Sequence, residues 1–214
     1  MQERSPLDLM RAAGLIPVLT IEKREQAVPL ARALVAGGVR MLEVTLRTPA
    51  GADAARAIRA EVEGAVVGLG TVLTRRDLEL ARELNRPFAF SPGATPELLD
   101  AARDLGVPFV PGVQTASELM VALARGFGVV KFFPAVPAGG IPALKALAGP
   151  FPEARFCPTG GIGEDAIGEW LALPNVAAVG GSWLAPAAEL DRGDWAAITA
   201  RAQRAMTRLG QANP

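Results

Sequence analysis

The amino-acid sequence predicts an α/β protein built as a single-domain (β/α)8 barrel that spans residues 1–214. Eight short apolar runs follow one another with their starts 20 to 26 residues apart, which is the length of one strand–helix unit with short loops. Helix signals fill the intervals, and no linker or low-complexity tract divides the chain. Successive parallel strands need helical crossovers, so eight such units predict a closed barrel. A doubly wound open sheet is the alternative, which the absence of a dinucleotide-type glycine fingerprint after the first strand disfavours.

The expected strands are apolar stretches with β-branched and aromatic residues, the types that pleated and packed surfaces favour. Residues 1–14 precede the first of them and are expected to form an N-terminal helix or extension. The eight predicted strands cover residues 16–21, 41–46, 66–72, 88–92, 108–113, 129–134, 155–160 and 176–182.

Several of the intervening segments carry recognisable helix starts. Thr115 is a candidate N-cap, with Glu118 three residues later to complete a capping box and Gly126 as a stop signal. Thr74 and Thr95 are expected to begin two further helices in the same way.

Composition excludes several classes of function. Half of the residues are hydrophobic and 21% are charged, which suits a sizeable core. Lys plus Arg and Asp plus Glu both total 22, so the sequence predicts neither a nucleic-acid partner nor an anionic membrane surface. We see no signal peptide and no run of 18 apolar residues, and the only cysteine is Cys157. These features predict a cytoplasmic protein without an intrachain disulfide.

The chain contains no histidine and no tyrosine. Acid–base chemistry must therefore use carboxylates, lysine, the single cysteine or water. A histidine-based triad and a histidine-ligated metal site are both excluded.

The second strand alternates apolar and polar residues. Its apolar face should meet the surrounding helices, so Glu43 and Arg47 are expected to point into the mouth of the barrel. In a barrel, the carboxyl ends of the strands are where functional residues gather. A structural ion pair or a solvated rim remains the alternative for these two residues.

Lys131 is the only charged residue in the run VVKFFPAVP, and no acid lies within four residues of it. If its face of the strand is the inward one, its amine enters the same mouth as Glu43 and Arg47. Apolar walls and a neighbouring cation such as Arg47 would favour the uncharged amine, which is a nucleophile suited to imine chemistry on a ketone. An ion pair with Glu43 that only stabilises the barrel remains open.

Small residues gather at three other strand ends. Thr71 lies beside glycines at the end of the third strand, and glycine pairs end the seventh and eighth strands. Barrels often build a phosphate site from the loops after strands seven and eight, because unobstructed N–H groups can approach the anion there. The candidate donors are Gly160, Gly161, Gly181 and Ser182.

The segments LEVTLRT, GTVL, SPG, PGVQTASELM, KFFPA, ALAGPFPEARFCPTGGI and GGSWL resemble those of the 2-keto-3-deoxy-6-phosphogluconate (KDPG) aldolase family. The resemblance runs from about residue 15 to the end and is strongest over 129–184. It implies a class I, Schiff-base aldolase on a (β/α)8 barrel, commonly a homotrimer, that acts on a keto acid phosphate in the Entner–Doudoroff route.

The resemblance also implies roles for individual residues. Lys131 would form the imine, Glu43 would transfer protons, and Arg47 and Thr71 would hold the carboxylate end of the substrate. No metal and no cofactor is implied beyond the imine itself.

The remaining implied residues bind the rest of the substrate. Phe133 and Thr159 would line the pocket, and the glycine-rich strand ends would take the phosphate through Gly160, Gly161, Gly181 and Ser182. Related substrates stay open as alternatives: 4-hydroxy-2-oxoglutarate, and the galactonate epimer of KDPG. So do a phosphosugar isomerase or epimerase barrel, in which Lys131 has no covalent role, and a non-catalytic phosphate-ligand-binding barrel.

Overall fold

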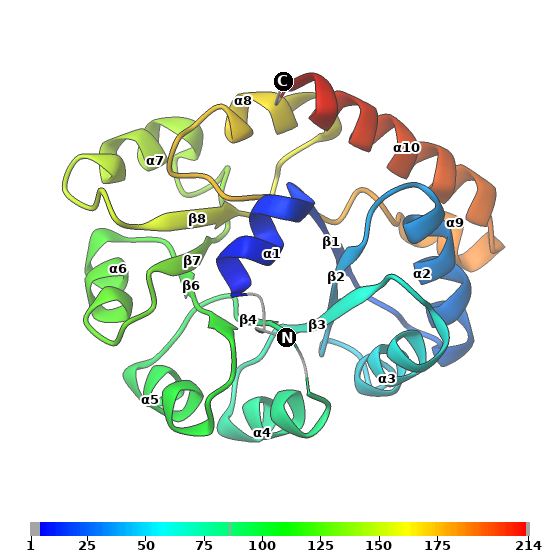
Figure 1. Ribbon diagram of the computed structural model, residues 1–214, viewed down its shortest axis with the longest axis horizontal. Coiled ribbons are helices and arrows are strands. Elements are labelled where there is room, and N and C mark those ends of the chain that lie inside the picture. The colour runs from blue at the N-terminus through cyan, green and yellow to red at the C-terminus, as the bar shows by residue number, and fades with distance from the viewer. Residues whose placement is uncertain (1–4, 86, 213–214) are drawn as a thin grey trace.

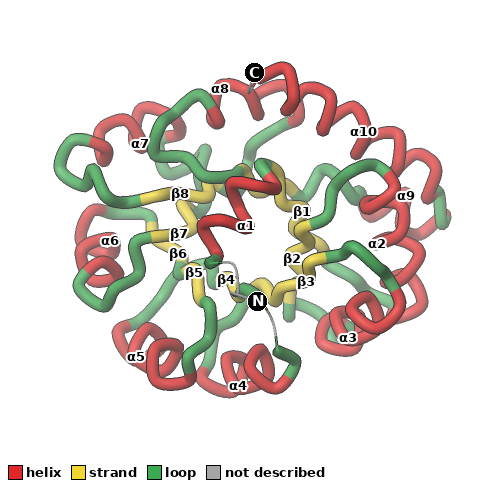
Figure 2. Tube along the Cα trace, viewed as in Figure 1, coloured by secondary structure: helices red, strands yellow, loops and turns green. Residues whose placement is uncertain are grey.

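A ring of parallel strands forms the centre of the protein, and helices surround it (Figures 1 and 2). The computed structural model describes residues 5–85 and 87–212. Six strands are hydrogen-bonded in the order β5-β4-β3-β2-β1-β9 and three in the order β6-β7-β8. Two isolated bridges, Phe156 with Val176 and Thr159 with Gly180, join the last strands of the two groups. The strands are β1 (Leu15–Leu19), β2 (Met41–Thr45), β3 (Val66–Gly70), β4 (Ala89–Phe90), β5 (Phe109–Val110), β6 (Gly112–Val113), β7 (Val129–Phe132), β8 (Arg155–Pro158) and β9 (Val179–Gly181).

Except for α1, the described helices lie outside the ring, and those between successive strands make the crossovers that parallel neighbours require (Figure 2). They bury their apolar faces against the outward side chains of the strands in two large hydrophobic clusters. The described helices are α1 (Pro6–Ala13), η1 (Arg24–Gln26), α2 (Ala27–Ala36), α3 (Gly51–Glu61), α4 (Arg75–Glu83), α5 (Pro96–Leu105), α6 (Ala116–Leu123), α7 (Gly140–Ala148), η2 (Glu164–Ala166), α8 (Ile167–Leu171), α9 (Ala187–Arg192) and α10 (Trp195–Ala212).

The predicted barrel is confirmed, and each of the eight predicted runs contains strand residues. The fifth run differs in detail, because it is divided into β5 and β6 at Pro111. Proline has no N–H to give to a neighbouring strand. The Gly112 N–H instead donates to the Ser91 hydroxyl at 3.1 Å, while the Pro111 carbonyl accepts from the N–H of Lys131 at 2.8 Å. The strand thereby changes partners from β4 to β7, and the ring still closes.

Helix α1 covers the centre of the ring (Figure 1). It leads directly into β1, so it lies at the amino ends of the strands. Its Met10 is fully buried among side chains of the barrel interior that include Ile16, Phe88 and Phe90. The helix therefore closes the end of the barrel that lies opposite the mouth.

The predicted helix starts are confirmed. Thr74 and Thr115 each accept a hydrogen bond from the backbone N–H three residues later within a complete capping box, and Thr95 caps α5. The predicted stop at Gly126 is wrong by a few residues, since α6 ends at Leu123. Gly126 has φ of 87° in the turn that follows, which explains why glycine stands there.

Within residues 5–85 and 87–212, no helix has both the length and the apolar character that a membrane crossing requires.

Candidate active site

A buried ion pair lies inside the barrel. The Lys131 amine donates to both carboxylate oxygens of Glu43, with Nζ 2.9 Å from Oε1 and 3.2 Å from Oε2. The two residues are only 2% and 1% exposed. Lys131 is on β7 and Glu43 is on β2. If β5 and β6 are counted as one strand, β2 and β7 are four strands apart in either direction around the ring. The pair therefore spans the barrel from one wall to the other.

Aromatic and sulfur-containing side chains surround the amine. Nζ lies 5.3 Å from the ring centre of Phe90 and 5.5 Å from that of Phe133. Cys157 stands beside Lys131 on the neighbouring strand β8. The inward orientation and the apolar walls expected for Lys131 are present, but the charged group in contact with it is the Glu43 carboxylate rather than the guanidinium of Arg47.

Arg47 and Thr71 lie together above this pair, just beyond the ends of β2 and β3. The Arg47 Nε donates to the Thr71 hydroxyl at 3.1 Å, and the Arg47 side chain reaches the surface. Thr71 has φ of 58°, in the left-handed region that β-branched residues rarely adopt. Such strain persists only where surrounding structure maintains it, and it concentrates at functional sites.

The predicted glycine-rich ends meet at one pocket of about 120 Å³. Seven of the ten predicted site residues line it, and Glu43, Thr71 and Lys131 do not. The ring of Phe133, which does line it, has its centre 5.5 Å from the Lys131 amine. The lining also includes three residues that sequence reasoning did not single out. The complete lining is Val18, Arg47, Phe133, Thr159, Gly160, Gly161, Ile162, Gly180, Gly181 and Ser182.

Backbone conformation explains two of these glycines and close packing a third. Gly160 and Gly161 have φ of 103° and 82°, which disfavour any side chain. Gly180 stands against Thr159, whose Cβ would lie 3.0 Å from a Cβ at Gly180 and whose hydroxyl would lie closer still. These strand ends can therefore present N–H groups to an anion without obstruction.

Phe90 is the neighbour of the Lys131 amine that sequence reasoning missed most clearly. Its run FAFSP alternates, so the inward position of Phe88 implies an inward Phe90. The distance between the Phe90 side chain and the amine depends on how β4 and β7 lie relative to each other, which cannot be predicted from a local sequence pattern.

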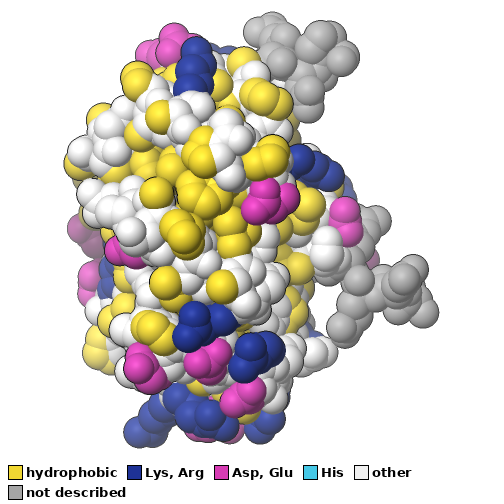
Figure 3. Space-filling view, turned by 90° about the vertical axis from the view of Figure 1, so that its left-hand side faces the viewer, with side chains coloured by type: hydrophobic (Ala, Val, Ile, Leu, Met, Phe, Trp, Pro, Cys, Tyr) yellow, Lys and Arg dark blue, Asp and Glu magenta, His cyan; other side chains and the backbone are white. Residues whose placement is uncertain are grey.

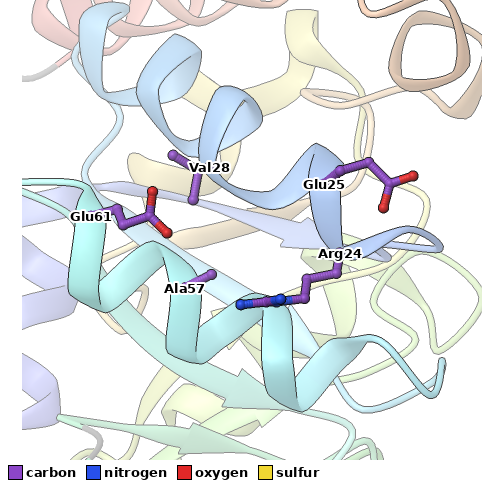
Figure 4. Close-up of a pocket in the computed structure, with 5 residues that line it drawn as sticks. All are labelled: Arg24, Glu25, Val28, Ala57 and Glu61. Atoms are coloured by element: carbon purple, nitrogen blue, oxygen red, sulfur yellow. The ribbon is translucent and has the colours of Figure 1, made fainter.

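A second, larger cavity of about 370 Å³ lies on the outside of the barrel, between η1 and α2 on one side and α3 on the other. Arg24 and Glu61 face it from opposite sides, with Val28 and Ala57 between them (Figure 4). It contains none of the predicted site residues. Among the residues that the structure describes, no group of three or more His, Cys, Asp or Glu side chains is placed to hold a metal ion.

Comparison with known proteins finds relatives of this chain in sequence and in structure. The family model described as "KDPG and KHG aldolase" matches residues 7–201. The KHG/KDPG aldolase of Escherichia coli is 50% identical over 198 residues, which cover 92% of this chain and 93% of that one. A KDPG aldolase structure from Legionella pneumophila, with pyruvate captured as a covalent carbinolamine intermediate, has a TM-score of 0.91 at 44% identity and covers 95% of this chain and 99% of that one. One from Zymomonas mobilis with 3-phosphoglycerate has a TM-score of 0.88 at 46% identity, covering 94% of each chain.

Fold and site together define a (β/α)8 barrel with a buried amine–carboxylate pair beneath a glycine-lined pocket. Both the family match and the identity to relatives extend over nearly the whole chain. The chain belongs to the KDPG and KHG aldolase family.

The Cys157 thiol provides a pH-dependent prediction. Burial raises its pKa from 9.0 to about 12, with the charge of Glu43 acting in the same direction and Lys131 and the Thr159 hydroxyl opposing it. Because the folded pKa is the higher one, this thiol's contribution to stability is complete below pH 9 and is lost as pH rises toward 12. Thiolate absorbance near 240 nm should therefore appear near pH 9 in unfolded protein and about three pH units later in folded protein.

Tyrosine ionisation, which occurs over the same pH range, does not interfere with this measurement, because the chain contains no tyrosine. Cys157→Ala supplies the baseline. A thiolate signal near pH 9 in folded protein would contradict the burial of the thiol.

Proposed function

We propose that this protein is a class I aldolase that cleaves 2-dehydro-3-deoxy-6-phosphogluconate to pyruvate and glyceraldehyde 3-phosphate, the lyase step of the Entner–Doudoroff route. The observation that carries the proposal is the pair of Lys131 Nζ and Glu43 Oε1, 2.9 Å apart and shielded from water. Taking two charges out of water is costly, and a buried ion pair is weak evidence of added stability. The pair is better explained by chemistry than by stability.

Lys131 begins the reaction. Its proton passes to Glu43 or to water, and the neutral amine attacks the C2 ketone of the substrate. Loss of the oxygen as water leaves a protonated imine. The imine withdraws electrons, so breaking the C3–C4 bond leaves its electron pair in an enamine rather than in an unstabilised carbanion. The imine thus takes the place of a separate cofactor.

Glu43 serves the proton transfers. The carboxylate, directly or through a water molecule, removes the proton of the C4 hydroxyl as the aldehyde leaves, and the same acid then returns a proton to C3 of the enamine. Hydrolysis of the resulting imine releases pyruvate and restores Lys131. Proton transfer by a positioned group is worth about 10² to 10⁴ in rate.

The ends of the substrate are held by different chemistry. Arg47, steadied by Thr71, suits the planar carboxylate because a guanidinium can form two parallel N–H bonds. The N–H groups of the glycine-rich ends and the Ser182 hydroxyl suit the phosphate, and Phe133 and Thr159 line the space between.

A second substrate is supported by the same pocket. The lining after β8 and β9 offers uncharged donors, and an uncharged donor set can accept a carboxylate as well as a phosphate. The Escherichia coli relative is named for both 4-hydroxy-2-oxoglutarate and KDPG. We therefore propose secondary activity on 4-hydroxy-2-oxoglutarate. The test compares kcat/KM for KDPG, for 4-hydroxy-2-oxoglutarate and for the galactonate epimer of KDPG. A rate on 4-hydroxy-2-oxoglutarate equal to that of a buffer blank would contradict the proposal.

Borohydride trapping tests the covalent step. Reduction in the presence of pyruvate should add one stable mass to the peptide that contains Lys131, because reduction fixes the imine. The chain offers its own control in Lys145, which is exposed and should remain unlabelled. Label on another lysine, or label that persists in Lys131→Met, would contradict the assignment.

Substituting the carboxylate tests the proton transfer. Glu43→Gln keeps the size of the side chain and a hydrogen-bond acceptor for Lys131 but removes the base. It should retain borohydride trapping with pyruvate and lose 10²-fold or more of its cleavage rate, by the usual worth of a positioned base. Full cleavage activity in a folded Glu43→Gln protein would remove Glu43 from the mechanism.

We also propose that the protein assembles as a homotrimer. Hydrophobic side chains gather on the face that carries α6 and α7 in Figure 1 (Figure 3). Met120 on α6 and Val136 after β7 are 59% and 48% exposed, and no charged residue occurs between Lys131 and Lys145. Contiguous exposed apolar surface of this kind typically marks an interface with another chain.

Light scattering tests this assembly. The native protein should have three times the mass of one chain, and Met120→Glu should lower the mass because it buries a charge in the contact. Gln203→Glu adds the same charge at an exposed position of α10, on another side of the barrel, and should leave the mass unchanged. A monomeric native protein would refute the proposal.

The proposed setting is the cytoplasm, with a small keto acid phosphate as the binding partner. The balanced charge of the chain and its one cysteine support this setting. Recovery of the activity from a periplasmic or membrane fraction after cell lysis would contradict it.

A further inference from the structure

Two glycines on β3 occupy inward positions. Gly68 and Gly70 are two residues apart on one strand, so they face the same side of the sheet, and both are buried. Neither has φ in the left-handed region. Backbone conformation therefore does not require glycine at either position. We conclude that glycine stands there because it leaves space for neighbouring side chains.

Different side chains fill the two spaces. A Cβ on Gly68 would lie 2.6 Å from Cζ of the Phe88 ring, with other ring atoms closer. A Cβ on Gly70 would lie 2.6 Å from Cγ and 2.8 Å from Cδ of Glu43, with Oε1 closer still. Real Cβ atoms do not come so near, so the carboxylate occupies its position only because residue 70 has no side chain.

Strand register shows what this space does to the direction of Glu43. Glu43 is level with Gly68, whereas Gly70 is level with Thr45, two residues nearer the mouth. The Phe88 ring fills the space beside Gly68. The carboxylate consequently extends toward Gly70, where Oε1 meets the Lys131 amine at 2.9 Å.

We propose that Gly70 is a positioning residue for the reaction, which holds the Glu43 carboxylate at the height of the Lys131 amine and of the substrate carbons attached to it. The inference rests on the proposed role of Glu43 as the proton-transfer group. Gly70 leaves the space in which that base is placed, whereas Gly68 leaves space for the packing of the barrel interior.

The test separates proton transfer from imine formation. In D2O the enzyme should exchange the methyl hydrogens of pyruvate, since the imine and the enamine interconvert through the base, and NMR follows that exchange. Borohydride trapping measures imine formation on the same sample. In Gly70→Ala, the exchange rate per trapped site should fall about 100-fold, because the base is displaced while the amine remains.

Two glycine controls and a double substitution make the test specific. Gly68→Ala meets Phe88 and should lower stability while keeping the ratio of exchange to trapping. Gly93→Ala has open space and should change neither quantity. With Glu43→Ala present, the side-chain atoms that meet the new methyl are gone. Adding Gly70→Ala to that background should then have no further effect on the exchange rate.

The outcomes are decisive in each direction. An unchanged ratio in Gly70→Ala, or an equal further loss in the Glu43→Ala background, overturns the inference while leaving the proposed function in place. If Gly70→Ala does not fold, recovery of folding by Glu43→Ala supports the inference, and continued failure overturns it. A native protein that traps pyruvate without exchanging its methyl hydrogens overturns both this inference and the role of Glu43.

Discussion

The ion pair between Lys131 and Glu43 is the interaction on which the rest of the site depends. It joins opposite walls of the barrel, so it forms only when the ring of strands has closed in the correct register. When the pair forms, both charged groups lose their hydration in an interior lined by aromatic rings, which is energetically costly. In the proposed mechanism this cost serves reactivity, because an amine and a carboxylate 2.9 Å apart can exchange a proton without a change in net charge.

Room for this pair comes from side chains that are absent. Inward positions of a small barrel are normally filled by branched residues that pack into layers. Here Gly70 leaves space for Glu43, and Gly180 leaves space for Thr159. Phe88 fills the space beside Gly68, below the carboxylate, and α1 closes the amino end of the barrel with Met10. Phe88 and Met10 thus fill the interior below the pair, whereas glycines beside and above it leave room for the Glu43 and Thr159 side chains.

Sequence patterns predicted the periodic features of this protein well. Strand spacing, capping residues and the alternation around Glu43 depend on neighbours along the chain, and the structure has them where they were expected. The division of the fifth strand was not predicted although Pro111 is visible in the sequence, because the partners on either side of it, the Ser91 hydroxyl and the Lys131 N–H, belong to distant segments of the chain. The Phe90 ring beside the amine and the carboxylate beside Gly70 were not predicted either, since both depend on how side chains of different strands lie relative to one another.

Thr71 shows how far the site departs from what stability alone would select. Glycine would adopt a φ of 58° without strain, yet a β-branched residue stands there and its hydroxyl accepts the hydrogen bond from Arg47. A left-handed backbone for such a residue costs on the order of 1–3 kcal/mol. That strain and the buried charges of Lys131 and Glu43 occur at the same end of the same barrel. These exceptions to the local rules of folding lie together at the candidate site, and the regular strand–helix units around it supply the stability that compensates for their cost.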